Sequence, residues 1–372
     1  MSHYLSEIDE LLARAEMLPD GPAKVAVVER AVQVADLHAD VAAGFRTRVR
    51  LLGAALSGGQ SDVLLVAFSW CLSRQERDPA QFRETDILWQ FRWVISELVE
   101  YSTVAKAQID SLFADMERRY RRAGSSMRSY FVLRRMVAID MGDREAAIAA
   151  HSEVIRCPHD GLSDGADAET SFLLDFLIVT GRDDEAIELG ASFLGRGQGS
   201  EHHQAFVRAK LLLPLLKHAR DAEAVDAHLK GYRQVARNAR YVPRFAEHLI
   251  FLALTENFPR GFRLLERHLS DAEVSVSGYA RMLFHHAARV LLTRVAERGR
   301  ETLRMRLPKS FPRYSEDGRY EAAGLAAWFG ERAGEAAQAF DARNGNGHYA
   351  AMYAGWRDLE KWARFVTLPK AV

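Results

Sequence analysis

The sequence contains little cysteine and no excess charge of either sign. Only two cysteines, Cys71 and Cys157, occur in 372 residues, too few for a disulfide framework or a set of zinc ligands. Lysine plus arginine equals aspartate plus glutamate, at 50 each. A chain without excess positive charge is a poor candidate for general binding of nucleic acid or anionic membranes. We therefore expect neither partner.

Long apolar runs are also missing. The longest, such as residues 211–216 (LLLPLL), fall far short of the ~20 residues that a membrane span needs. The N-terminus, MSHYLSEIDELLARAEM, is acidic and amphipathic and lacks the apolar core of a signal peptide. These absences predict a cytoplasmic protein without a membrane segment.

Common catalytic motifs are absent as well. The sequence has no Gly-x-Ser-x-Gly, no phosphate-binding Gly-x-x-x-x-Gly-Lys-Ser/Thr and no His-Glu-x-x-His. We therefore expect no enzyme activity, no metal and no cofactor. A helical stack can nevertheless assemble a catalytic site from residues that are distant in sequence, so an enzyme stays among the alternatives.

What the sequence does contain is helical periodicity along almost its whole length. A repeat is visible in the middle, where a small residue recurs near the start of every second helix. The small residues are 39, 38 and 37 positions apart: Ala147, Ala186, Ala224 and Gly261. Such a residue lets two helices approach closely, and because one helix pair cannot bury its apolar face alone, several pairs must stack.

The segment Gly142–Ala147 resembles the turn and second-helix start of the tetratricopeptide repeat. When the family's unit of about 34 residues is laid on this repeat, Phe131 falls at the large aromatic position of the first helix. Pro158 lies one residue before the family's usual proline. Arg135 stands where the family prefers Gly or Ala, and the period is a few residues longer. The resemblance covers roughly residues 126–270.

Three further segments are similar to those of a group of uncharacterised bacterial tetratricopeptide-repeat proteins: His159–Asp164, Arg260–Leu269 and Phe340–Gly345. Some members carry a Cys-x-x-Cys pair where this chain has Gly165 and Ala168, so the resemblance implies no thiol or metal role for that loop. The resemblance implies an all-α superhelix, or solenoid, of stacked antiparallel helix pairs, and it implies no particular activity.

The chain is expected to divide into divergent N-terminal hairpins, the clearest repeats and a C-terminal cap: residues 1–125, 126–270 and 271–372. The cap contains the least helical part of the sequence, a long loop at about 301–320 with a short strand at 302–307. Two more helices are expected after it, at about 321–342 and 347–366.

Several polar clusters were weighed as sites. The loop at 157–169 (CPHDGLSDGADAE) fits neither an EF-hand nor a zinc ribbon, so we favour an acidic loop that caps the next helix. The pairs His202-His203 and His285-His286 are adjacent in sequence and do not chelate as i and i+4 residues do. We expect the first pair to open a helix and one member of the second to pack against a neighbour.

Four arginines surround Tyr120 at the end of an expected helix at about 104–123: Arg118, Arg119, Arg121 and Arg122. A solvated helix end, where cations suit the helix dipole, is favoured over a nucleic-acid patch with a stacking aromatic. A dense aromatic run before it is expected to pack between hairpins rather than to form an exposed stripe: Phe82, Trp89, Phe91, Trp93 and Tyr101.

In tetratricopeptide arrays the first helix of each pair lines the inner surface, and the resemblance assigns those positions here. The predicted partner-binding groove comprises Val132, Met136, Ile139, Asp175, Phe206, Leu213 and Ile250. The same register includes Ala209 and Ala246, so the groove is expected to be mostly apolar. It lacks the Lys, Arg and Asn of the family's clamp for a C-terminal carboxylate, which favours an amphipathic helix or apolar peptide. The chain's own segment 347–366 is an equally weighted occupant.

The resulting hypothesis is a protein-protein interaction scaffold or adaptor that grips a protein or an apolar peptide, with a homodimer left open. It predicts that Phe206→Glu or Met136→Glu abolishes partner binding. One alternative is a peptide-sensing regulator that acts through another protein, because no helix-turn-helix DNA-binding domain is recognisable. The other is an enzyme on a helical scaffold, which a polar cavity with several carboxylates would favour.

Overall fold

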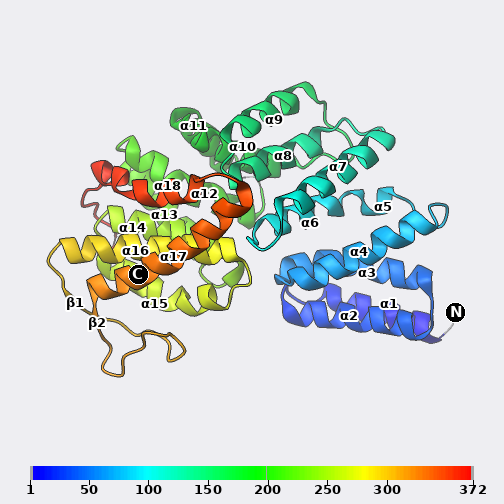
Figure 1. The fold of residues 1–372 in the computed structure, drawn as a ribbon, viewed down its shortest axis with the longest axis horizontal. Coiled ribbons are helices and arrows are strands. Elements are labelled where there is room, and N and C mark those ends of the chain that lie inside the picture. The colour runs from blue at the N-terminus through cyan, green and yellow to red at the C-terminus, as the bar shows by residue number, and fades with distance from the viewer. Residues whose placement is uncertain (1–2, 198, 370–372) are drawn as a thin grey trace. The chain divides into compact units, whose positions relative to one another are not determined.

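The structure, a computed structural model, describes residues 3–197 and 199–369 and confirms an all-α fold of packed helix pairs (Figure 1). The helices of the N-terminal third are α1 (His3–Glu16), α2 (Pro22–Leu37), α3 (Val41–Gly58), α4 (Ser61–Arg77), α5 (Thr85–Leu88), α6 (Gln90–Val99) and α7 (Lys106–Arg122). The repeat region contains α8 (Arg128–Asp140), α9 (Arg144–Arg156), α10 (Ala166–Val179), α11 (Asp183–Gly195), α12 (Glu201–Lys217), α13 (Asp221–Val235), α14 (Val242–Leu254) and α15 (Phe258–Val274). The C-terminal helices are α16 (Gly278–Glu297), α17 (Ala322–Asn344) and α18 (His348–Ala354), and two 3₁₀ turns are η1 (Ala239–Tyr241) and η2 (Gly355–Trp362).

The chain forms two compact units. Unit 1 consists of Met1–Val99, Lys106–Leu133 and Glu153–Ser163. Unit 2 consists of Glu100–Ala105, Arg134–Ser152 and Asp164–Val372. These units follow contacts in space, whereas the expected division at residues 125 and 270 follows sequence similarity, and that division stays a prediction.

The same three-residue turn joins the two helices of each pair in the repeat region. Its central residue has a positive φ in all four pairs, at 72°, 80°, 55° and 56°: Gly142, Gly181, Ala219 and Glu256. In each turn the amide of the following residue donates to the carbonyl five residues before it, which satisfies a free carbonyl at the helix end. The repeat that the spacing predicts is therefore also a repeat of backbone conformation.

The small anchor residues explain why the second helices pack so closely. Ala147, Ala186 and Ala224 are fully buried near the starts of α9, α11 and α13. At Gly261 in α15, a Cβ would lie 2.7 Å from a methyl group of Leu291 in α16. Larger side chains at these positions would force the helices apart.

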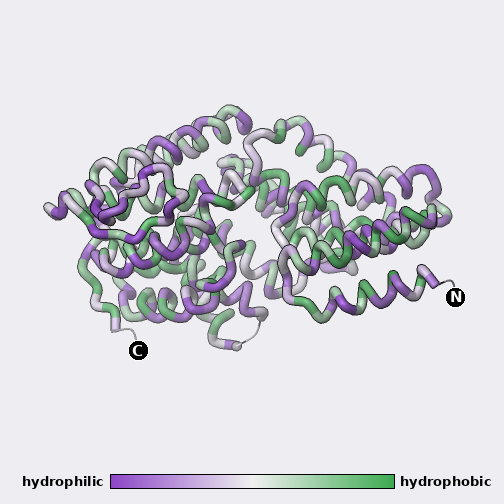
Figure 2. The backbone as a smooth tube through the Cα atoms, turned by 90° about the horizontal axis from the view of Figure 1, so that it is seen from below, coloured by the Kyte–Doolittle hydropathy of each residue, from purple (hydrophilic) through white to green (hydrophobic). Residues whose placement is uncertain are grey.

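One hydrophobic core cluster runs through unit 2 from α8 to α17 and includes Leu177, Leu212, Leu249, Leu291 and Phe329. Hydrophobic and hydrophilic segments alternate along the helices (Figure 2), as amphipathic helices that share a core require. No helix in the described part of the chain is long and apolar enough to cross a membrane.

The segment after α16 leaves the helical pattern, as the sequence predicts. Strand β1 (Thr302–Arg304) pairs antiparallel with β2 (Arg319–Glu321). Phe311, in the loop between them, packs against Trp328 of α17 with ring centroids 4.7 Å apart. The helix expected at 347–366 is divided into α18, η2 and an extended tail.

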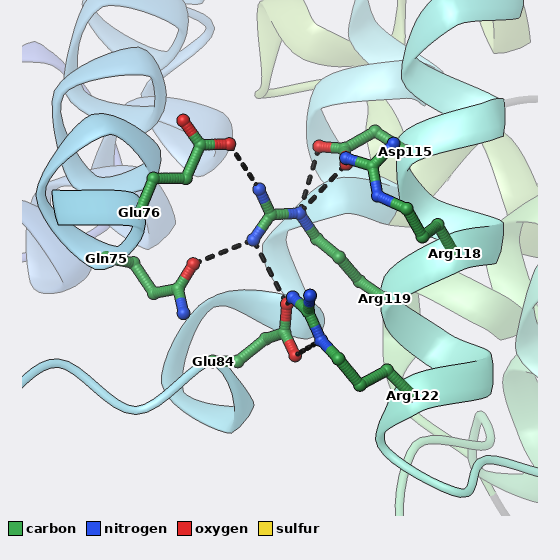
Figure 3. A network of polar contacts seen from close by, with 7 residues as sticks. All are labelled: Gln75, Glu76, Glu84, Asp115, Arg118, Arg119 and Arg122. Carbon is green, nitrogen blue, oxygen red and sulfur yellow. Dashed lines mark hydrogen bonds and ion pairs between the residues drawn. The ribbon is translucent and has the colours of Figure 1, made fainter. Parts of the chain in front are cut away.

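The expectation of a solvated arginine cluster is wrong for Arg119. Its side chain is 2% exposed in unit 1 and is surrounded by acceptors from three segments (Figure 3). Its guanidinium donates to Gln75 and Glu76 at the end of α4, at 2.7 and 2.5 Å. It also donates to Glu84 at 3.1 Å and to Asp115 of its own helix at 3.0 Å. The burial arises because α7 presents Arg119 on its core-facing side.

The acidic loop at 157–169 contacts the connection between α7 and α8. Asp160 accepts hydrogen bonds from the Ser125 hydroxyl at 2.9 Å and the Ser126 amide at 2.7 Å, so it fixes the connection between α7 and α8. Gly165 precedes α10 and supplies no side-chain cap, and the expectation that this loop caps the next helix stays a prediction.

The two histidine pairs lie in helices. The prediction that His202 and His203 open a helix is confirmed, since α12 begins at Glu201 and Ser200 caps the His203 amide. Both members of the second pair are buried. His285 contacts Glu273 at 2.8 Å, and His286 stacks on Tyr353 with ring centroids 4.0 Å apart.

Candidate functional site

The first helices of the repeat pairs lie side by side in unit 2, because α12 contacts both α10 and α14. One face of these three helices is crossed by a chain of ion pairs. Lys210 of α12 lies 2.7 Å from Asp175 of α10 and 3.4 Å from Glu247 of α14. Arg244, one turn before Glu247, pairs with it at 3.0 Å. These four residues and Phe206 are here termed the charged face.

Phe206 is the aromatic centre of the charged face. The Lys210 Nζ lies 5.5 Å from its ring centroid, and the Arg244 Cζ lies 4.6 Å from it. Phe206 and Lys210 share a helix side because they are four residues apart on α12. Contacts between a ring and cations at such distances are attractive, and more so when water is partly excluded.

The charged side chains are half-buried, with exposures between 13% and 24%. Within the described part of the chain, Glu247 Oε2 and Arg244 Nη1 are buried without a hydrogen-bond partner. The Arg244 nitrogen lies near the other carboxylate oxygen of Glu247 but is not aligned for a hydrogen bond. A buried polar atom without a partner is costly.

Asp140, at the end of α8, belongs to the same electrostatic neighbourhood. Burial, followed by the negative charge of Asp175, raises the pKa of the Asp140 carboxyl to about 7, against the opposing effect of Lys210. Burial, followed by Tyr349 and Asp140, raises the pKa of Tyr279 well above its ordinary value. Unit 2 thus contains a carboxyl that changes its protonation near neutral pH, beside fixed charges of both signs.

We expect Asp140→Asn to stabilise the protein at pH 8, on the order of 2–4 kcal/mol, and to lose more than half of this gain by pH 5. The folded state binds the Asp140 proton more tightly than the unfolded state, where the ordinary pKa is 3.8. Ionisation between about pH 4 and pH 7 therefore costs the wild type stability, and an amide avoids that cost. Urea unfolding from pH 5 to pH 8 measures the difference, with the exposed Asp226→Asn as the matched substitution. A gain that does not change with pH would contradict the assignment.

The seven residues that the resemblance assigns to a groove fall in different surroundings. Asp175 and Phe206 belong to the charged face. Val132 in unit 1 and Ile139 in unit 2 are buried in the protein interior, at 0% and 9% exposure, and therefore have almost no surface for a ligand. Met136 is half-buried on α8. Leu213 and Ile250 pack against the C-terminal tail.

The C-terminal tail (residues 363–369) lies along the last turns of α12 and α14. The Arg364 amide donates to the Leu254 carbonyl at 3.0 Å, and the Val366 amide donates to Thr255 at 3.2 Å. The Arg364 guanidinium also donates to the Leu216 carbonyl at 2.8 Å and pairs with Asp221. The chain's own C-terminus thus covers the layer near Leu213 and Ile250, whereas the charged face lies toward the start of α12.

The expectation of a mostly apolar inner face is wrong at the charged face, because two of the assigned positions are offset by one residue. The resemblance assigns Ala209 and Ala246 to this face, but both are buried at 2% and 3% exposure. Their neighbours Lys210 and Glu247 occupy it instead. One residue rotates a helix by about 100°, which exchanges a core position for a surface position. The spacing of Phe206 and Lys210 is the signal that could have placed the charges.

Comparison with known proteins does not identify a family for this arrangement. No protein-family model matches the chain, and no curated protein matches it either. The fold therefore defines the class, a protein of stacked helix pairs, and the charged face is the basis for a function.

Proposed function

We propose that the protein is an interaction scaffold or adaptor of the tetratricopeptide type, and that its charged face binds a segment of a protein partner. The observation that carries the proposal is the ion-pair chain from Asp175 through Lys210 to Glu247, which presents half-buried charges of both signs around Phe206. The repeating turns and small anchor residues support the tetratricopeptide assignment.

The charges favour a partner segment different from the purely apolar peptide that the sequence suggests. A segment with an acidic and a basic side chain could pair with Arg244 and Glu247, whose side chains are 13% and 24% exposed. An aromatic or aliphatic side chain beside these charges could cover the ring of Phe206. Complementary charges of this kind contribute specificity and association rate more than affinity.

Affinity capture from the native cell, read against matched variants, tests the proposal. We expect Lys210→Met and Phe206→Glu to lose the partner that the wild type captures, and higher salt to weaken that capture. Lys230→Met is the control, since Lys230 lies on the second helix α13 and is 51% exposed. Circular dichroism establishes that each variant is folded. A partner retained by both folded face variants would contradict the proposal.

The pKa of Asp140 favours a second candidate, an acid–base enzyme on a helical scaffold. A carboxyl that titrates near pH 7 is suited to exchange protons with a substrate. Such an enzyme would show a turnover that depends on pH with a midpoint near 7, and Asp140→Asn would abolish it. An interaction scaffold would keep its partner in the same variant.

A further inference from the structure

A second surface of unit 2 has no role in the proposed interaction scaffold and differs from the charged face in composition. A cavity of about 780 Å³ lies between the second helices α13 and α15, away from the residues of the charged face. Its apolar lining comes from Leu229 of α13, which is 37% exposed, and from the half-buried ring of Tyr232, while Leu252 and Leu264 are buried behind it. This volume lies in the range of small-molecule sites, which are mostly apolar with a few placed polar groups.

Four arginines line the same cavity: Arg233, Arg260, Arg263 and Arg267. Three of them share one side of α15 because they are spaced by three and four residues. Arg260 is half-buried, and its burial, followed by the nearby charge of Arg263, lowers its pKa. Because positive charges gathered in this way repel one another, a bound anion would stabilise them.

These arginines lack the carboxylate partners that other arginines of unit 2, such as Arg244 and Arg294, have. Among residues 3–197 and 199–369, no carboxylate lies within 4.0 Å of any of these four guanidinium groups. Glu266 is the one acidic residue in the lining, and it accepts a hydrogen bond from the Arg306 amide at 2.7 Å. Arg260 donates to the Pro369 carbonyl, which is a neutral acceptor.

Tyr232 adds an ordered polar group to the lining. Its hydroxyl lies 3.0 Å from His268 Nε2, and His268 Nδ1 lies 2.9 Å from Asp271. Asp271 accepts the proton of Nδ1, which leaves Nε2 as the acceptor for the Tyr232 hydroxyl. The buried His268 thus holds the phenol in place near Arg267. An oxygen lone pair and the ring of Tyr232 remain to line the cavity.

We propose that this cavity binds a small anionic amphiphile, with a phosphate or carboxylate head held by the arginines and an apolar body packed on Leu229 and the ring of Tyr232. Arginine is suited to the head because its planar guanidinium donates two parallel hydrogen bonds to such groups. The exposed leucine and tyrosine beside the arginines favour a ligand with an apolar body over a bare inorganic anion. The limited volume favours a small molecule over a folded partner.

Isothermal titration of the full chain with three probes tests the two parts of the ligand separately. We expect n-decyl phosphate, used below its micellar concentration, to bind with one-to-one stoichiometry. Inorganic phosphate supplies the head alone and decanol the body alone, and each is expected to bind at least roughly tenfold more weakly. Decanoate measures how far a carboxylate replaces the phosphate, and its binding would also support the proposal.

Variants of exposed residues tie the binding to this cavity. Arg263→Gln and Arg267→Gln are each expected to weaken decyl phosphate binding by roughly tenfold, because each removes a charged hydrogen-bond donor. Lys230→Gln removes one positive charge from α13 outside the lining and should leave the affinity unchanged. Leu229→Glu places an acid among the arginines and should abolish binding.

Three outcomes would overturn the proposal. They are decyl phosphate binding that both arginine variants leave unchanged, equal affinities for decyl phosphate and inorganic phosphate, and no binding of decyl phosphate or decanoate by the folded wild type. Binding only to vesicles of anionic lipid, with no response to the free amphiphiles, would also overturn it in favour of a membrane surface.

Discussion

Replacement of Arg119 by alanine is expected to destabilise unit 1 by about 3–5 kcal/mol, the largest effect of any single charge in that unit. Arg119 is the shared partner of Glu76, Glu84 and Asp115 (Figure 3). Glu84 and Asp115 are only 15% and 16% exposed. Without the guanidinium they would remain partly buried and repel each other, which costs more than the loss of the hydrogen bonds alone.

The protonation of Glu84 gives this prediction a pH dependence. Burial acts to raise the pKa of Glu84, but Arg122 and Arg119 outweigh it and hold the pKa below the ordinary value. A lowered folded-state pKa stabilises the protein above the unfolded pKa of about 4.5, and this stability is lost as the pH falls through the folded pKa. The defect of Arg119→Ala should therefore be largest near neutral pH and smaller at pH 4.

Hydrogen exchange localises the effect to the helices that the network joins. We expect Arg119→Ala to speed amide exchange in α4 and α7, and Arg119→Lys, which keeps the charge but not the planar fork, to cause an intermediate change. Arg118→Ala is the matched control, because Arg118 is 64% exposed and pairs with Asp115 alone. Equal exchange in Arg118→Ala and Arg119→Ala would show that the buried network does not hold these helices together.

The repeat could be predicted because its signals are local. The spacing of Ala147, Ala186 and Ala224 reports a close helix approach, and all three are fully buried. The turns after α12 and α14 are harder to predict from the sequence, since Ala219 and Glu256 adopt a positive φ that their residue types do not favour. Packing of the flanking helices determines that conformation, and a local sequence pattern does not predict packing between distant residues.

The same limit explains what was missed at the candidate sites. Arg119 looks like any exposed arginine at a helix end until Glu76 and Glu84 are brought to it by the fold. The sequence predicts part of the cavity between α13 and α15, because the helical spacing of Arg260, Arg263 and Arg267 places them on one side of a helix. Leu229, Tyr232 and Arg233 come from α13, and only the structure unites them with the arginines of α15.

Replacement of Gly142 by alanine is expected to destabilise unit 2 by about 2–4 kcal/mol, although three other repeats carry the same turn. A Cβ on Gly142 would lie 2.3 Å from the Cβ of His348, the first residue of α18. The backbone there has a φ of 72°. The neighbouring carbonyl of Met141 also accepts a 2.7 Å hydrogen bond from Asn346, so the α8–α9 turn is the surface on which α18 rests.

Gly181→Ala separates the cost of the backbone from the cost of this contact. Gly181 occupies the equivalent turn with a φ of 80°, and a Cβ there meets nothing within 4 Å. We expect it to cost about 1 kcal/mol, since Ala219 and Glu256 show that the turn accepts a side chain. In urea unfolding, His348→Gly, which removes the Cβ that the new methyl group meets, should reduce the Gly142→Ala defect to the Gly181→Ala value. Equal defects in the two glycine variants, with no effect of His348→Gly, would show that α18 does not need this turn.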